Sequence, residues 1–254
     1  MQTDGDITLD VTQGVASLNF HHSKRNALTR TLLNNLAGEI TQLGAREDVR
    51  VIVLRSSGDE VFCAGAYFHD LLGIETFEQG KEFFLGFARL ILAMKSCPKF
   101  IIARVHGKAI GGGVGIVAAT DHAFALGTAS IKLSELDLGL GPFVVGPPIE
   151  RKLGVAAFSA LATDTSWRDA AWARHHGLYA EVFETVSELD AATATLASRL
   201  SRSNPEAMAK LKAVFWEGTE HWDTLLKTRA EISGRLVLSD YTVKALAAAK
   251  ASKS

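Results

Sequence analysis

The most informative stretch of the chain is residues 106–115, which read HGKAIGGGVG. It follows an apolar run, 100–105, that predicts a buried strand, and it precedes an apolar segment that predicts a helix. Glycines let a ligand approach the main chain closely. A loop that opens a helix also presents unpaired N–H groups and the positive end of the helix dipole. The stretch therefore predicts either a ligand-binding loop or a tight strand–helix packing, and the pattern alone leaves both open.

Two nucleotide-binding motifs are excluded by their spacing. A G-x-G-x-x-G fingerprint that begins at Gly111 would need a glycine where Ile116 stands. No G-x-x-x-x-G-K-[ST] motif occurs in the chain. A ligand held by the glycine loop must therefore be recognised by another chemistry.

Two further segments have the composition of a site. Residues 62–66 read FCAGA and follow an apolar run; N–H groups from this loop and from the glycine loop would form an oxyanion hole if they converge. Residues 131–142 read IKLSELDLGLGP and place Glu135 in an apolar, glycine-rich setting. That carboxylate is either an ordinary solvated loop residue or a desolvated acid–base group, and the pattern does not choose between them.

Strands alternate with helices in the first part of the chain. Apolar and polar residues alternate on both sides of Gln13-Gly14, which predicts a β-hairpin with one buried face. Thr29 can cap an amphipathic helix, and Pro98 ends a second one. The predicted strands are residues 7–11, 15–20, 49–54 and 100–105. This order indicates an α/β fold.

Strand signals disappear after about residue 185. The elements predicted beyond it are all helices, at residues 189–200, 205–216, 222–238 and 241–249. We therefore predict an organisational boundary, with an α/β core that carries the candidate site in residues 1–185 and a helical region in residues 186–254.

Composition narrows the class of protein. The chain has 254 residues, 47% of them hydrophobic, and a formal net charge of −1, so nucleic acid and acidic membrane surfaces are not expected partners. Cys63 and Cys97 fit neither a zinc-ligand pattern nor a disulfide framework. No stretch resembles a signal peptide or a membrane span. We expect a soluble cytoplasmic enzyme without a metal.

Taken together, these segments resemble the crotonase (enoyl-CoA hydratase/isomerase) superfamily over essentially the whole chain. The matching features, in chain order, are Lys24-Arg25-Asn26-Ala27-Leu28, Ala64-Gly65-Ala66, Gly111-Gly112-Gly113, Asp121, Ser134-Glu135 before Gly139, and Ala173 through Gly177-Leu178. The resemblance implies a spiral of ββα units, with C-terminal helices that support homotrimers or homohexamers.

The resemblance also implies the chemistry of the site. It places the N–H groups of Ala66 and Gly112 at the family's oxyanion-hole positions, where they would stabilise the enolate of an acyl-CoA thioester. It makes Glu135 the catalytic carboxylate. It places Lys24, Asn26, Ala27 and Ala64 against coenzyme A. The substrate itself carries coenzyme A, so no separate metal or redox cofactor is implied.

The chain departs from the family pattern at two positions. Family hydratases carry a glutamate where Gly115 stands, and an aspartate commonly follows the Ala-Gly-Ala loop where this chain has Tyr67. The first departure removes one of the two carboxylates that hydratases use to add water. A hydratase would then need another polar group, for which Tyr67, His69 and Asp137 are candidates.

Four interpretations follow. By the family's usual activity we place enoyl-CoA hydratase first. A Δ3-Δ2 enoyl-CoA isomerase comes next, because one carboxylate, Glu135, can take a proton from one carbon and return it to another. Acyl-CoA decarboxylation or thioester hydrolysis would rely mainly on the oxyanion hole. A non-catalytic CoA-ester or RNA-binding relative would keep the fold and lose the chemistry.

Overall fold

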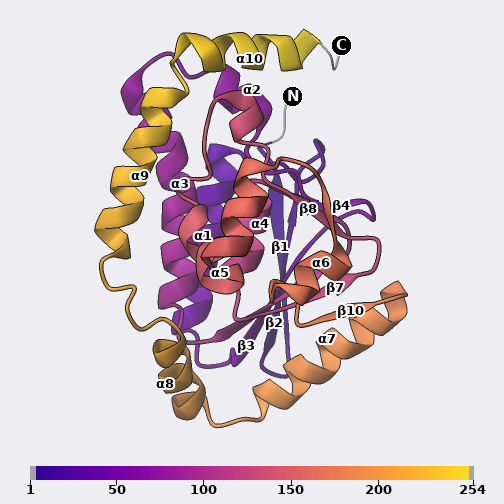
Figure 1. The fold of residues 1–254 in the computed structure, drawn as a ribbon. Coiled ribbons are helices and arrows are strands. Elements are labelled where there is room, and N and C mark those ends of the chain that lie inside the picture. The colour runs from indigo at the N-terminus through magenta and orange to yellow at the C-terminus, as the bar shows by residue number, and fades with distance from the viewer. Residues whose placement is uncertain (1–3, 252–254) are drawn as a thin grey trace.

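A six-stranded sheet runs through the computed structural model, which describes residues 4–251 (Figure 1). Its strand order is β1-β2-β3-β5-β7-β10. The first two strands form the antiparallel hairpin that the alternation predicts, and the remaining pairs are parallel. Gln13 and Gly14 turn the hairpin with φ of 52° and 80°, as a two-residue loop of type I′ requires. The strands are β1 Asp6–Thr12, β2 Val15–His21, β3 Val51–Ser56, β5 Phe100–Val105, β7 His122–Leu126 and β10 Glu181–Phe183.

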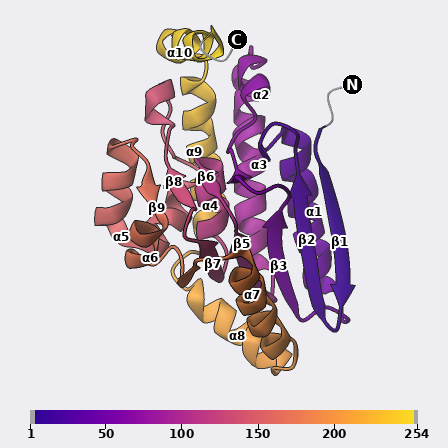
Figure 2. The same cartoon turned by 90° about the vertical axis from the view of Figure 1, so that its right-hand side faces the viewer.

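A second sheet of four short strands stands beside the first (Figure 2). Its order is β4-β6-β8-β9, so strands that alternate in the sequence go to different sheets and the chain winds as a spiral. These strands are β4 Val61–Cys63, β6 Lys108–Ile110, β8 Ser130–Lys132 and β9 Arg168–Asp169. Strand β6 lies inside the glycine stretch that was expected to be a loop, because three residues are too few to show a two-residue period. The α/β prediction is confirmed.

Helices α1 (Arg30–Ala45) and α3 (Phe77–Ser96) form where the periodicity predicts them. The Thr29 hydroxyl accepts a hydrogen bond from the N–H of Leu32 and so caps α1. Helix α3 begins with a capping box and ends before Pro98. Both helices pack on each other against the first sheet and bury one face.

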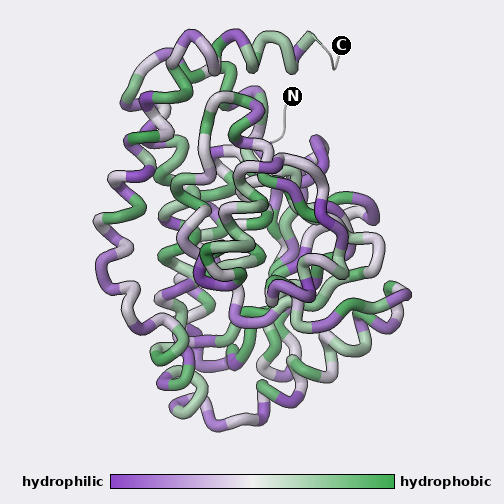
Figure 3. Tube along the Cα trace, in the orientation of Figure 1, coloured by the Kyte–Doolittle hydropathy of each residue, from purple (hydrophilic) through white to green (hydrophobic). Residues whose placement is uncertain are grey.

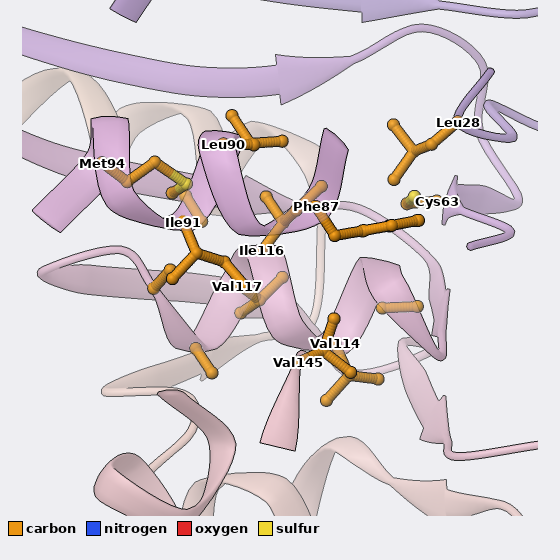
Figure 4. Close-up of a cluster of buried hydrophobic side chains, with 14 of the residues drawn as sticks. Leu28, Cys63, Phe87, Leu90, Ile91, Met94, Val114, Ile116, Val117 and Val145 are labelled. Carbon is orange, nitrogen blue, oxygen red and sulfur yellow. The ribbon is translucent and has the colours of Figure 1, made fainter. Parts of the chain in front are cut away.

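The short helix α4 (Gly112–Ala118) is buried along its whole length. Figure 4 shows its side chains Val114, Ile116 and Val117 among Phe87, Leu90, Ile91 and Met94 of α3. This apolar cluster holds α4 against α3, and α4 also contacts β4 and β6 of the second sheet. Burial of each large apolar side chain stabilises the fold by about 1.5–3 kcal/mol.

No strand follows Phe183 among the described residues, as the sequence predicts. Helix α7 packs on the first sheet, α9 lies along α3, and α10 reaches back to the short helix η1 (Leu136–Leu138). These C-terminal helices are α7 Val186–Ser201, α8 Pro205–Phe215, α9 Trp222–Leu236 and α10 Asp240–Ala251; the remaining ones are α2 Phe68–Leu72, α5 Gly146–Thr163 and α6 Ala170–His175. The boundary at residue 185 stays a prediction, and residues 252–254 lie outside the described residues.

Hydrophobic residues concentrate in the interior where α3, α4 and the sheets meet, and hydrophilic residues mark the outer helices and loops (Figure 3). Within residues 4–251, none of the helices combines the length and the apolar character that crossing a bilayer requires.

Candidate active site

The loop that follows β4 points one N–H group away from its neighbouring strand. Leu28 and Ala66 form an isolated parallel bridge, in which the N–H of Leu28 donates to Gly65 O and the N–H of Tyr67 donates to Leu28 O. In such a bridge the intervening residue turns its own N–H to the opposite side. The N–H of Ala66 therefore faces away from Leu28 and makes no backbone hydrogen bond to a described residue.

The second N–H group belongs to the first residue of α4. Gly111 precedes the helix with φ of 51° and ψ of −115°, a backbone conformation that favours glycine. Its N–H donates to Lys132 O at 2.8 Å, which anchors the loop to β8. The N–H of Gly112 is one of the unpaired donors that every helix start presents.

Gly65 brings these two loops together. A Cβ atom on Gly65 would lie 2.7 Å from Ile110 O and 3.5 Å from Gly112 N, so the loops are in contact at this point. Gly65 also has φ of 79°, a left-handed conformation that favours glycine independently of this close contact. The structure thus brings Ala66 and Gly112 close together, with donor groups that can stabilise a developing oxyanion.

The Glu135 carboxylate lies against the glycine loop. A Cβ atom on Gly111 would lie 2.8 Å from Glu135 Oε1 and 3.6 Å from Oε2. Oε2 is buried without a hydrogen-bond partner among the described residues. Burial raises the pKa of Glu135 to about 7, and backbone hydrogen bonding at Glu135 itself and at Ser134 offsets part of this effect. Of the two interpretations left open by the sequence, the structure excludes the ordinary solvated carboxylate, because Oε2 is buried, and the acid–base role stays a prediction.

The loop that carries Glu135 is held from both ends. The carbonyl oxygen of Glu135 accepts hydrogen bonds from Leu138 N at 3.1 Å and Leu140 N at 2.9 Å. Gly139, with φ of 75°, lies against α10, where the hydroxyl of the fully buried Thr242 donates to Gly139 O at 3.2 Å. The C-terminal helix therefore fixes the backbone that positions the carboxylate, a contact that sequence reasoning missed because Thr242 and Gly139 are far apart in the chain.

At position 115, where family hydratases have a second carboxylate, the space for a side chain is occupied by Val145. A Cβ atom on Gly115 would lie 2.5 Å from Val145 Cβ and 2.8 Å from Val145 Cγ1. Val145 is itself buried. A larger side chain at position 115 would thus require Val145 to move.

Tyr67, His69 and Asp137, the candidates to replace the second carboxylate, differ in their surroundings. The Tyr67 ring is buried and stacks on His69 at 5.5 Å between centroids, at the start of α2. Asp137 points to the surface, where it forms an ion pair with Lys132 at 3.2 Å and accepts a hydrogen bond from Thr165 at 2.6 Å. Asp137 is thus engaged elsewhere, whereas Tyr67 directly follows the N–H group of Ala66.

Three of the residues expected at coenzyme A, Lys24, Asn26 and Ala27, lie in one loop, which is hydrogen-bonded to the loop that carries Ala64 and Ala66. The N–H of Ala64 donates to Arg25 O at 3.1 Å, and Lys24 is exposed. The buried Asn26 amide donates to Ser57 O and Val61 O at 2.6 and 2.9 Å, and its oxygen accepts from the N–H of His22 at 3.1 Å. The Asn26 side chain thus orders the loop, and the Lys24 side chain on it is exposed.

Comparison with known proteins agrees with this geometry. The family model for enoyl-CoA hydratase/isomerase matches residues 10–240. The chain therefore belongs to the enoyl-CoA hydratase/isomerase family, within the crotonase superfamily. The predicted crotonase-like fold is confirmed by a crystal structure of an enoyl-CoA hydratase from Mycobacterium avium, with a TM-score of 0.86, 28% identity, and coverage of 99% of this chain and 98% of that one.

Its relatives carry different activities in their names. A peroxisomal Delta(3,5)-Delta(2,4)-dienoyl-CoA isomerase of Arabidopsis thaliana is 30% identical over 213 residues, which are 78% of this chain and 75% of that protein. Enoyl-CoA hydratase ACTT6 of Alternaria alternata is 33% identical over 190 residues, and the match covers 74% of this chain and 62% of that protein. The family is thus of lyase or isomerase type and acts on acyl-CoA substrates.

Proposed function

We propose that the chain is an enoyl-CoA hydratase in which Glu135 is the acid–base carboxylate. The observation that carries the proposal is the buried Glu135 carboxylate beside the N–H groups of the glycine loop, with its pKa raised to about 7. At neutral pH such a group is divided between its two protonation states, so it can both accept and deliver a proton. A relative named enoyl-CoA hydratase, at 33% identity, supports the same choice.

The reaction balances with this one carboxylate. The thioester oxygen of a 2-enoyl-CoA accepts hydrogen bonds from the N–H groups of Ala66 and Gly112. Glu135 takes a proton from water as the water oxygen bonds to Cβ, and the electron pair of the double bond moves into the thioester enolate. Glu135 then gives that proton to Cα, which yields the 3-hydroxyacyl-CoA. Each oxyanion donor contributes about 2.7–4 kcal/mol in enzymes where such donors have been removed.

The packing at Gly115 favours one second candidate, a double-bond isomerase. Val145 occupies the space beside Gly115, where a second carboxylate would be needed to hold water in the two-carboxylate hydratase pattern. In this reaction Glu135 removes a proton from C2 of a 3-enoyl-CoA and returns it to C4. The same oxyanion donors stabilise the dienolate between the two steps.

We further propose that Lys24, Ala27 and Ala64 contact coenzyme A, with Asn26 holding their loop. Exposed apolar residues on α8 support a homo-oligomer, trimeric or hexameric as in the family. They are Leu211, Val214 and Phe215. Light scattering on the purified protein measures the oligomer directly, and a monomer would refute this part of the proposal.

Two substrates separate the two reactions. Purified protein is incubated with crotonyl-CoA and, separately, with a 3-enoyl-CoA, and the products are followed by absorbance and mass. Addition of 18 Da to crotonyl-CoA, lost in Glu135→Gln, supports the hydratase. Conversion of the 3-enoyl ester without a mass change supports the isomerase. Binding of both esters without turnover would refute both functions for these substrates.

A further inference from the structure

A groove of about 620 Å³, lined by polar residues and by Leu9 and Val186, lies on the sheet face that α7 partly covers. Its lining includes Arg55 and Arg104 on the sheet, Asp190 on α7, and the outward face of the β1–β2 hairpin. Figure 2 shows the hairpin at the edge of the sheet, beyond α7. Neither Glu135 nor the glycine loop lines this groove.

The floor of the groove is a row of polar residues across four strands. In the strand register Thr8 pairs with Asn19, and Asn19 pairs with Arg55. Leu54 pairs with Ala103, so Arg55 stands beside Arg104 on the next strand. Neighbouring strands are about 4.8 Å apart, and side chains in register on one face are in contact range.

The two arginines break the apolar character of this face. On β3 the same face presents Val51 and Val53 before Arg55, and those valines pack under α7. On β5, Ile102 lies in the same apolar cluster and Arg104 follows it. Core packing explains the apolar residues, and it does not explain two guanidinium groups side by side, because like charges opposite one another destabilise a sheet.

Nearby carboxylates compensate only one of these charges. Arg104 is buried, and its Nε donates to Asp190 Oδ1 at 2.6 Å. Arg55 is half-buried and makes no ion pair or hydrogen bond to another residue in the described part of the chain. Asp10 also lines the groove, and its carboxylate accepts the hydroxyl of Thr12 at 2.9 Å.

Hydroxyl and amide groups complete the lining next to Arg55. Ser56 follows Arg55 in β3 and pairs with the buried Phe20, so its buried hydroxyl points to the opposite face of the sheet and is not part of the groove's donor set. The Asn19 amide donates to Ser57 Oγ at 2.8 Å and so orders the adjacent hydroxyl. A guanidinium without an anion beside the ordered Ser57 hydroxyl and the Asn19 amide is a donor set suited to a bound oxyanion.

We propose that this groove is a second binding site, which takes a small molecule through a phosphate or carboxylate group held by Arg55. Arg104 is already paired with Asp190 and stiffens the site, and its charge is compensated by that carboxylate. The proposal does not depend on the reaction at Glu135. Since Ser57 O accepts from Asn26 in the expected coenzyme A loop, the groove borders that loop, and competition with coenzyme A is part of the test.

Titration calorimetry in a buffer without phosphate or carboxylate tests the site, with inorganic phosphate and acetate as separate probes. We expect wild-type protein to bind at least one probe, and Arg55→Gln to weaken that binding at least tenfold. The preference between the probes identifies the oxyanion. Arg50→Gln is the matched control, because Arg50 is half-buried and immediately precedes β3, at the end away from Arg55, so this variant should bind as wild type does.

A second variant keeps the test informative if Arg55→Gln fails to fold. Asn19→Asp places a carboxylate directly beside Arg55 in the register, so it should raise the melting temperature and abolish binding of the probe. Three results would overturn the proposal: no binding by wild-type protein, equal binding by Arg55→Gln and wild type, or displacement of the probe by free coenzyme A, which would assign the groove to the substrate.

Discussion

Replacing Glu135 by glutamine should change activity and stability in opposite directions. Glutamine cannot exchange a proton, and removal of a general acid–base group typically lowers the rate about 10²–10⁴-fold. At the same time the variant no longer has a buried carboxylate to ionise. A loss of activity that accompanies a gain of stability cannot be attributed to misfolding.

The stability effect follows from the raised pKa. The pKa of Glu135 is 4.5 before burial and about 7 in the folded protein. The native state therefore binds more protons than the unfolded state between these values, and stability falls as pH rises through that window. The full pKa change corresponds to about 3 kcal/mol in the free energy of unfolding. Between pH 5 and pH 8 the free energy of unfolding should fall by about 2.5 kcal/mol.

The measurement is urea unfolding of wild type and Glu135→Gln at pH 5 and pH 8. From pH 5 to pH 8 the free energy of unfolding of the variant should rise by about 2.5 kcal/mol relative to that of wild type, because glutamine does not titrate. The exposed Glu47→Gln serves as the control and should follow wild type at both pH values. A pH-independent difference between wild type and Glu135→Gln would refute the assigned burial of the carboxylate. Activity of wild type should also increase as pH rises toward about 7, because the carboxylate starts the reaction unprotonated.

Three other substitutions test the surroundings of the site. Thr242→Val removes the hydroxyl that holds Gly139 O, so kcat should fall several-fold with little change in KM, as steady-state kinetics would detect; an unchanged kcat would exclude positioning by α10. Gly115→Glu should lower the melting temperature because of the contact with Val145, and adding Val145→Gly should restore it; a stable single variant would contradict the packing argument. Lys212→Met leaves a buried aspartate without its ion-pair partner at 2.9 Å, which should cost about 3–5 kcal/mol in denaturant unfolding.

Local patterns account for the elements that the sequence predicted well. The hairpin turn at Gln13-Gly14, the cap at Thr29 and the stop before Pro98 each depend on a few adjacent residues. The second sheet was not visible in the sequence, because its strands have two or three residues and obtain their pairing from distant segments. Tertiary contacts decide such elements, and a local period cannot report them.

The candidate site, like the fold, could be predicted from the sequence only in part. The glycine loop and Glu135 could be located from their sequence motifs. The other features of the site depend on contacts between segments far apart in the chain. They are the burial of Glu135 Oε2, the hydrogen bond from Thr242 to Gly139 O and the packing of Val145 against Gly115. The sequence therefore left open whether the carboxylate is solvated, and only the packing decides it.

The glycine at position 115 also changes how the remaining carboxylate must be tuned. In a site with two carboxylates, repulsion between them separates their pKa values and assigns one the role of base and the other that of acid. Glu135 has no carboxylate beside it at position 115, and burial alone raises its pKa. A value of about 7 leaves both protonation states populated at neutral pH, which one group needs if it is to take a proton and then return it. The raised pKa of Glu135 is thus compatible with both proposed mechanisms, hydration and isomerisation, which differ in whether a water molecule or a second substrate carbon lies within reach of the carboxylate.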